Sequence, residues 1–89
     1  GWADVVGDRV AGDTYPNLTN RLIKSTFSAS RTDSLDFEAW VDGVVVKEYR
    51  EVGAISTPRQ NCIEIDVPPD SDYSLKLEAG TVDRWKEMR

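Results

Sequence analysis

The sequence has 89 residues, a formal net charge of -5, a pI of about 4.6 and a mean hydropathy of -0.48. A chain of this length forms a single small domain, and its acidity and scattered basic residues argue against a nucleic-acid-binding surface. One cysteine and no histidine exclude an internal disulfide and a Cys/His metal centre, and no apolar run is long enough to span a membrane. Oligomerisation is therefore the expected additional support for so small a core.

The first third of the chain predicts short strands separated by turns. Residues Trp2–Val6 predict a short first strand, and Asp8–Tyr15 predict an extended arm or loop, because glycine, proline and asparagine interrupt this region. Arg21–Ala29 alternates weakly between apolar and polar residues, which predicts a second strand, and Ser28–Ser34 predicts a polar loop. The inward-facing residues of that strand are expected to be Ile23 and Phe27.

The clearest local pattern is a hairpin in the middle of the chain. Residues Leu35–Val41 alternate with a period of two, which places every second side chain on a core-facing side. Asp42 and Gly43 accept the positive φ of a two-residue type I′ turn, and Val44–Val52 returns as a second strand rich in strand-favouring residues. The expected core-facing residues of the first strand are Leu35, Phe37, Ala39 and Val41.

The last third predicts two more strands and an ambiguous tail. Gly53–Asn61 predicts a loop, and Cys62–Val67 a strand whose inward side carries isoleucine and valine. Pro68–Asp72 predicts a stiff turn, and Tyr73–Ala79 another alternating strand. Thr81–Arg89 is short for a helix, so a final strand is favoured. Six or seven short strands without a convincing helix predict an all-β fold, a small antiparallel β-sandwich or jelly roll.

Several motifs, in the same order along the chain, resemble those of one family: the C-terminal (tip) domain of tailed-bacteriophage tail fibre proteins. They are Trp2-Ala3-Asp4-Val5, Arg9, Gly12-Asp13-Thr14-Tyr15, Asn17-Leu18-Thr19, Trp40-Val41-Asp42-Gly43-Val44, Ile65-Asp66-Val67-Pro68-Pro69-Asp70-Ser71-Asp72-Tyr73 and Arg84-Trp85-Lys86-Glu87-Met88-Arg89. Ser71 departs from the pattern, which usually has glycine after the prolines. The resemblance implies a β-sandwich at the end of a longer, extracellular virion fibre, which trimerises and either caps the fibre or binds the host surface.

Paired carboxylates raise the question of catalysis. Asp36 and Glu38 share one strand face, as do Glu64 and Asp66, and carboxylate pairs can hydrolyse glycosides. The same spacing is ordinary on a solvated sheet face, and the sequence carries no histidine base and no Gly-x-Ser-x-Gly elbow. The expectation is therefore a non-enzymatic protein with no catalytic residues.

A calcium site is the second possibility that the acidic residues raise. Asp66, Asp70 and Asp72 bracket a turn and could offer oxygen ligands to a hard cation. The turn lacks the glycine and the terminal glutamate of an EF-hand loop, so a polar turn is the simpler interpretation. We expect neither a metal nor a cofactor.

The aromatic residues are the better candidates for recognition. If Phe37 points inward, Trp40 points outward beside Glu38, where it could stack on a sugar ring or pack against a neighbouring subunit. Subunit packing is favoured for Trp40 and Trp85, and Tyr49 carries the same ambiguity. Trp2, Tyr15 and Tyr73 are expected in core or turn packing, and Cys62 as a half-buried small hydrophobe.

Together these features favour multivalent attachment by a homotrimeric fibre tip to a host cell-surface glycan or protein, without membrane insertion. Receptor contacts are expected in three polar segments, 31–33, 53–61 and 68–72, where binding residues usually sit on a β scaffold. The candidate receptor-binding residues are Arg31, Thr32, Asp33, Thr57, Arg59, Gln60, Asp70 and Asp72; the candidate oligomer-interface residues are Trp40, Tyr49 and Trp85.

Two other functions stay open at the level of sequence. One is a monomeric extracellular carbohydrate-binding or Ig-like accessory module that uses Trp40 as a stacking platform. The other is a purely structural fibre cap with no receptor contact.

Overall fold

A computed structural model describes residues 1–31, 34–51 and 59–89, with Arg31 and Arg59 described by their backbones alone. The described part of the chain contains eight strands and no helix. The strands are β1 (Trp2–Asp4), β2 (Thr14–Pro16), β3 (Ile23–Arg31), β4 (Leu35–Val41), β5 (Val44–Glu51), β6 (Arg59–Val67), β7 (Asp72–Ala79) and β8 (Thr81–Met88).

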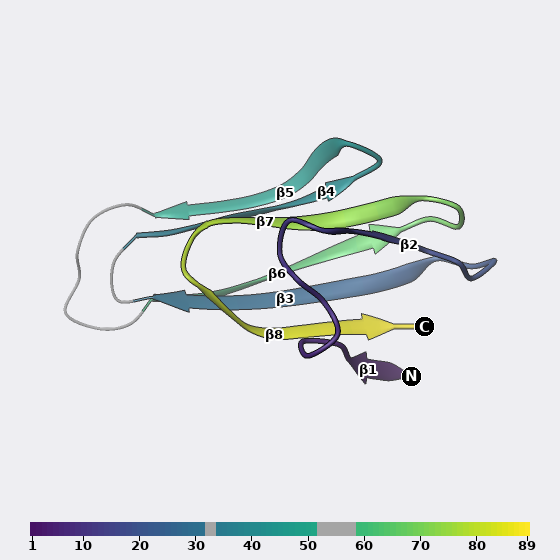
Figure 1. Cartoon of the computed structure of the whole chain (residues 1–89), viewed down its shortest axis with the longest axis horizontal. Helices are drawn as coiled ribbons and strands as arrows, with labels where there is room; N and C mark the ends of the chain where they lie inside the picture. The colour runs from purple at the N-terminus through teal and green to yellow at the C-terminus, as the bar shows by residue number, and fades with distance from the viewer. Residues whose placement is uncertain (32–33, 52–58) are drawn as a thin grey trace.

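The strands form two four-stranded antiparallel sheets that pack as a small β-sandwich, as the sequence predicts. The first sheet has the order β1-β8-β3-β6, and the second has the order β2-β7-β4-β5. Figure 1 shows the strands of both sheets running along the long axis, with the two chain ends at the same end of the molecule. There the backbone N–H of Arg89 donates to the carbonyl of Gly1 at 3.2 Å.

The alternating strands bury their apolar sides between the two sheets. Strands β3, β4, β6 and β7 contribute Phe27, Phe37, Ile65 and Leu75, all at most 4% exposed. Each side chain of this size stabilises the fold by about 1.5–3 kcal/mol when it is removed from water. Among the described residues, the buried apolar ones are Val5, Ile23, Phe27, Ala29, Leu35, Phe37, Ala39, Ile63, Ile65, Val67, Tyr73, Leu75 and Trp85.

The central hairpin forms at the predicted residues. Asp42 and Gly43 have φ values of 51° and 78°, the positive values that a type I′ turn requires, and Val41 pairs with Val44 across the turn. The predicted strand at the C-terminus is also confirmed, because β8 pairs with both β1 and β3. A short helix would leave β3 without that neighbour.

Several predicted boundaries are wrong, three of them in predicted loops. The polar loop predicted over Ser28–Ser34 is strand as far as Arg31, because β3 pairs with β6 over its whole length. The loop predicted over Gly53–Asn61 is strand from Arg59 onward, and its residues 53–58 lie outside the described ranges. Within the predicted arm Asp8–Tyr15, residues Thr14 and Tyr15 belong to β2, which pairs with β7. In each case backbone pairing with a neighbouring strand outweighs weak local propensity.

The side chains of Trp2 and Cys62 lie elsewhere than predicted. Trp2, expected in core or turn packing, is 48% exposed because strand parity turns Ala3 rather than Trp2 toward the core. Cys62, expected to be half-buried, is exposed because it shares the outer side of β6 with Glu64.

Candidate functional site

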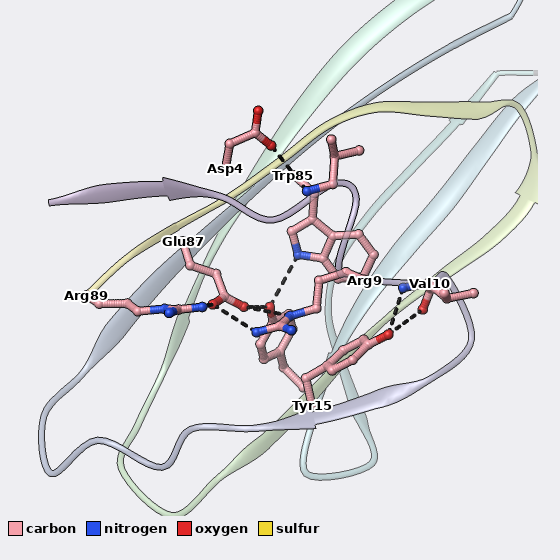
Figure 2. Close-up of polar contacts among 9 residues, drawn as sticks. Asp4, Arg9, Val10, Tyr15, Trp85, Glu87 and Arg89 are labelled. Atoms are coloured by element: carbon pink, nitrogen blue, oxygen red, sulfur yellow. Dashed lines mark hydrogen bonds and ion pairs between the residues drawn. The ribbon is translucent and has the colours of Figure 1, made fainter.

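A cluster of polar side chains lies near the end of the sandwich where the two termini meet (Figure 2). Its centre is the buried carboxylate of Glu87. Strand parity on β8 turns Trp85 and Glu87 inward, and they are 1% and 2% exposed. Arg9 reaches Glu87 from the segment after β1, with Nε 3.3 Å from Oε2 and Nη2 3.3 Å from Oε1. The Nε of Arg89 donates to Oε1 at 3.0 Å.

Two aromatic residues complete this cluster. The Tyr73 hydroxyl donates to the Glu87 carboxylate, and the indole N–H of Trp85 donates to the Tyr73 oxygen at 3.2 Å. Arg9 also lies over the ring of Tyr15, with its guanidinium carbon 4.5 Å from the ring centroid. Residues far apart in the sequence are thereby tied to the last strand.

The electrostatics of this cluster indicate a structural role. Burial alone raises the pKa of Glu87, but the hydrogen bonds from Tyr73, Arg89 and Arg9 outweigh it and hold the pKa below its ordinary value of 4.5. Burial and the bond to Glu87 raise the pKa of the Tyr73 phenol, so it stays protonated and donating at neutral pH. A buried, ionised carboxylate whose oxygens are occupied by donors is suited neither to proton transfer nor to nucleophilic attack.

The predicted receptor-binding residues fall at two opposite ends of the sandwich. Gln60 is exposed near the start of β6, whereas Asp70 and Asp72 are exposed beyond its end. The seven residue steps from Gln60 to Val67 alone span about 23 Å, so these residues do not form one site. Arg31 and Arg59 are register partners near Gln60, on β3 and β6. Thr32, Asp33 and Thr57 lie outside the described residues.

The acidic turn formed by residues 68–72, at the end of the sandwich opposite Gln60, is stabilised by hydrogen bonds of its backbone. The N–H of Asp72 donates to Oδ1 of Asp42 at 2.9 Å, and hydrogen bonds from Ser71 and Asp72 lower the pKa of Asp42. Asp70 has a φ of 64°, which places it in the left-handed conformation that a tight turn uses. Within the described ranges, no three acidic or cysteine side chains are grouped closely enough to hold a metal ion.

Both predicted carboxylate pairs lie on outer sheet faces. Glu64 and Asp66 share Lys24, whose Nζ lies 3.4 Å and 3.3 Å from their oxygens. On the second sheet, Asp36 lies 3.6 Å from the Nε of Arg50. These are solvated ion pairs, which contribute little to stability.

The three predicted interface aromatics have three different environments. Trp85 is a core residue, so its predicted role at a subunit surface is wrong; β8 turns it inward against Phe27 at a centroid distance of 5.0 Å. Tyr49 is half-buried and packs at 6.0 Å from Phe37. Trp40 lies on the outer face, where its indole N–H donates to Glu38 at 2.9 Å.

A lysine side chain on the same outer face, Lys76, covers one side of the Trp40 ring. The Nζ of Lys76 lies 4.3 Å from the ring centroid, a cation–π contact. A sugar that stacked on this side of the ring would have to displace Lys76. Trp40 is therefore a poorer stacking platform than its outward direction predicts.

An exposed apolar patch, here called the hairpin patch, lies at the end of the same hairpin. It consists of Val44, Val45 and Val46, which are 62%, 38% and 46% exposed, together with Trp40. Val45 lies beside Trp40 on the outer face and Val44 beside Val41 on the other face, so the exposed valines occupy both sides of the edge strand. β5 is an edge strand, and seven of its eight residues are exposed. An edge strand with exposed apolar residues offers unpaired backbone groups to another chain. A non-alternating valine run followed by charged residues was the sequence signal for this edge.

The outer face of the first sheet carries a second candidate surface, a shallow hollow of about 380 Å³. Its floor is formed by Thr26 and Ser28 of β3, and its sides come from β8, β6 and β1. Sequence analysis missed this surface because the pairing of β3 with β8 cannot be read from local patterns. The remaining lining residues are Trp2, Cys62, Glu64, Arg84 and Lys86.

The cysteine in this hollow is not an activated nucleophile. Partial burial and the nearby Glu64 charge raise the pKa of the Cys62 thiol, and the opposing effect of Arg84 is smaller. The thiol is therefore protonated at neutral pH, whereas a reactive cysteine needs a lowered pKa.

No protein-family model matches this chain, and a search of curated proteins finds no match either. The described part of the chain has no helix with the length and apolar character needed to cross a membrane. What the geometry offers is one structural ionic cluster and two exposed surfaces, the hairpin patch and the hollow on the first sheet.

Proposed function

We propose that this chain is a non-enzymatic, homotrimeric tip domain of a phage tail fibre, which acts in host-surface attachment, in fibre trimerisation or in both. The observation that carries the proposal is the hairpin patch on the edge strand β5, with Val44 62% exposed. The sequence resemblance supports it independently, because it extends over most of the chain and implies a β-sandwich.

Self-association through β5 would give a partner to a strand that, among the described residues, has a hydrogen-bonded neighbour on one side only. Of the residues in β5, only Tyr49 is half-buried, so the strand adds little to the core of its own chain. Copies arranged around a symmetry axis would cover Val44, Val45 and Val46 and would protect the edge from uncontrolled pairing. Three copies on one rigid tip also raise the avidity of a weak binding site by about 10²–10⁴.

The alternative of a monomeric carbohydrate-binding or Ig-like accessory module has less support. It depends on Trp40 as an open platform, and Lys76 covers one side of that ring. It also leaves the valines of the hairpin patch without a role.

The test uses two valines with the same exposure at different places. Val44 is 62% exposed on β5, and Val10 is 61% exposed in the segment between β1 and β2. We expect Val44→Lys to reduce the mass measured by light scattering to the 10.0 kDa of one chain, and Val10→Lys to leave the trimer intact. Equal behaviour of the two variants would place the interface elsewhere and contradict this role of β5.

A further inference from the structure

We infer that the hollow on the outer face of the first sheet is a binding site for an acidic saccharide, a sugar that carries a carboxylate or a phosphate. The inference rests on the proposed function, since it names the class of surface ligand that an attachment domain would take. It uses a face other than the hairpin patch, so the two proposals can fail separately.

The register of the sheet builds this hollow from two rows of side chains. In one row Lys86, Thr26 and Glu64 are neighbours on β8, β3 and β6; the next row along the strands is Arg84, Ser28 and Cys62. Directly opposed side chains in such rows have Cβ atoms about 4.5–5.5 Å apart. Short hydroxyl side chains in the middle and longer ones at both sides make the face concave.

The charges of the hollow favour an anion. Arg84 and Lys86 are exposed, and within the described residues neither forms an ion pair. Glu64, which also lines the hollow, pairs with Lys24 at 3.4 Å, and Asp4, the register partner of Lys86, accepts the N–H of Val6 at 3.2 Å. Arg84 and Lys86, about 7 Å apart along β8, thus place two cations in the lining against the one carboxylate of Glu64.

The remaining lining favours a sugar over other anions. Trp2 is 48% exposed at the β1 side, where its ring can stack on the apolar face of a pyranose. The volume of about 380 Å³ lies at the lower end of small-ligand sites, about 300–1,000 Å³.

The experiment measures binding of the whole chain to matched acidic and neutral sugars by isothermal titration calorimetry. The pairs are trigalacturonate with its methyl ester, sialyllactose with lactose, and mannose 6-phosphate with mannose, so that carboxylate and phosphate are tested separately. We expect at least one acidic probe to bind about tenfold more tightly than its neutral partner, which corresponds to one good charged contact. Raising the salt from about 0.1 M to about 1 M should weaken that binding.

Two pairs of variants locate the site. Arg84→Ala and Trp2→Ala should each weaken binding about tenfold. The matched controls Arg21→Ala and Leu22→Ala remove an exposed arginine and a 49% exposed apolar side chain, both outside the hollow, and they should leave binding unchanged. All four variants should keep the wild-type thermal melt, since none of these side chains belongs to the buried core.

Three results would overturn the inference: no preference for any acidic probe, equal losses in the control variants, or binding of single-stranded DNA with none of the sugars. The monomeric Val44→Lys variant separates this inference from the proposed function. It should still bind the acidic probe with the affinity of a single site. If the wild-type chain were monomeric and still bound the acidic sugar, the result would contradict the proposed trimer and leave the saccharide site intact.

Discussion

At the scale of single residues, Glu87 is the side chain on which the end of the sandwich depends. A carboxylate that is 2% exposed is tolerated because Arg9, Arg89 and Tyr73 all donate to it. The substitution Glu87→Gln would leave the guanidinium groups of Arg9 and Arg89 beside a neutral amide. The cluster also tethers the segment that leads from β1 to β2, since Arg9 lies over Tyr15.

The charge of Glu87 should be visible in stability. Glu87→Gln should lower the free energy of unfolding by about 2–4 kcal/mol, somewhat less than for a fully buried pair because Arg9 and Arg89 are partly exposed. Glu78→Gln, an exposed glutamate on β7, is the control and should have almost no effect. Urea unfolding of both variants measures the difference, and equal stabilities would show that the cluster contributes little.

The same residue predicts the direction of the pH dependence. The pKa of Glu87 is lower in the folded chain than its ordinary value of 4.5, so the unfolded chain binds the proton more readily. Its contribution to stability is complete above about pH 4.5 and is lost as the pH falls through the lowered, folded-state pKa. Thermal melts between about pH 3 and pH 7 should show wild type losing more stability at the acidic end than Glu87→Gln. Parallel curves would be inconsistent with a lowered pKa.

Residue-scale contacts were also the hardest part to predict from sequence. Alternate side chains of β8 face opposite sides of the sheet, so either Trp85 and Glu87 or Lys86 and Met88 point inward. Each orientation buries one charged residue. The choice depends on Arg9 and Tyr73, which are distant in sequence and adjacent only in the folded chain. The sequence therefore predicts the strand but not its orientation.

At the scale of elements, the local sequence pattern, alternation or strand propensity, was sufficient to predict the strands β3, β4, β5, β6 and β7 and the Asp42-Gly43 turn. It failed where a strand is polar or very short. The end of β3 and the start of β6 stay extended because each pairs with the other, as Ser30 does with Gln60. The strand β2 has only three residues, and its pairing with β7 holds it.

The turn between β7 and β8 makes a further prediction at this scale. Gly80 has a φ of 124°, and a Cβ there would lie 2.6 Å from Cδ1 of the buried Leu35. Gly80→Ala combines a strained backbone with a core clash, so we expect a loss of about 2–4 kcal/mol in the free energy of unfolding. Gly7→Ala is the control, because a Cβ at Gly7 meets nothing within 4 Å. Chemical denaturation of the two variants tests this, and a neutral Gly80→Ala would mean that the turn relaxes.

At the scale of the whole molecule, the two exposed surfaces lie on different parts of the sandwich. The hairpin patch lies on β4 and β5 of the second sheet, and the hollow lies on the outer face of the first. A symmetric assembly through β5 would therefore leave the hollows of all copies accessible to ligand. Neither surface could be assembled from sequence alone, because each depends on which strands become neighbours and which strand forms an edge.

The most direct measurement is the solution mass of the wild-type chain by light scattering, over a wide range of concentration and at low and high salt. We expect three times the 10.0 kDa of one chain, with little change on adding salt, because the proposed interface is apolar. A mass of 10.0 kDa at every concentration would contradict the homotrimer and the role assigned to the hairpin patch.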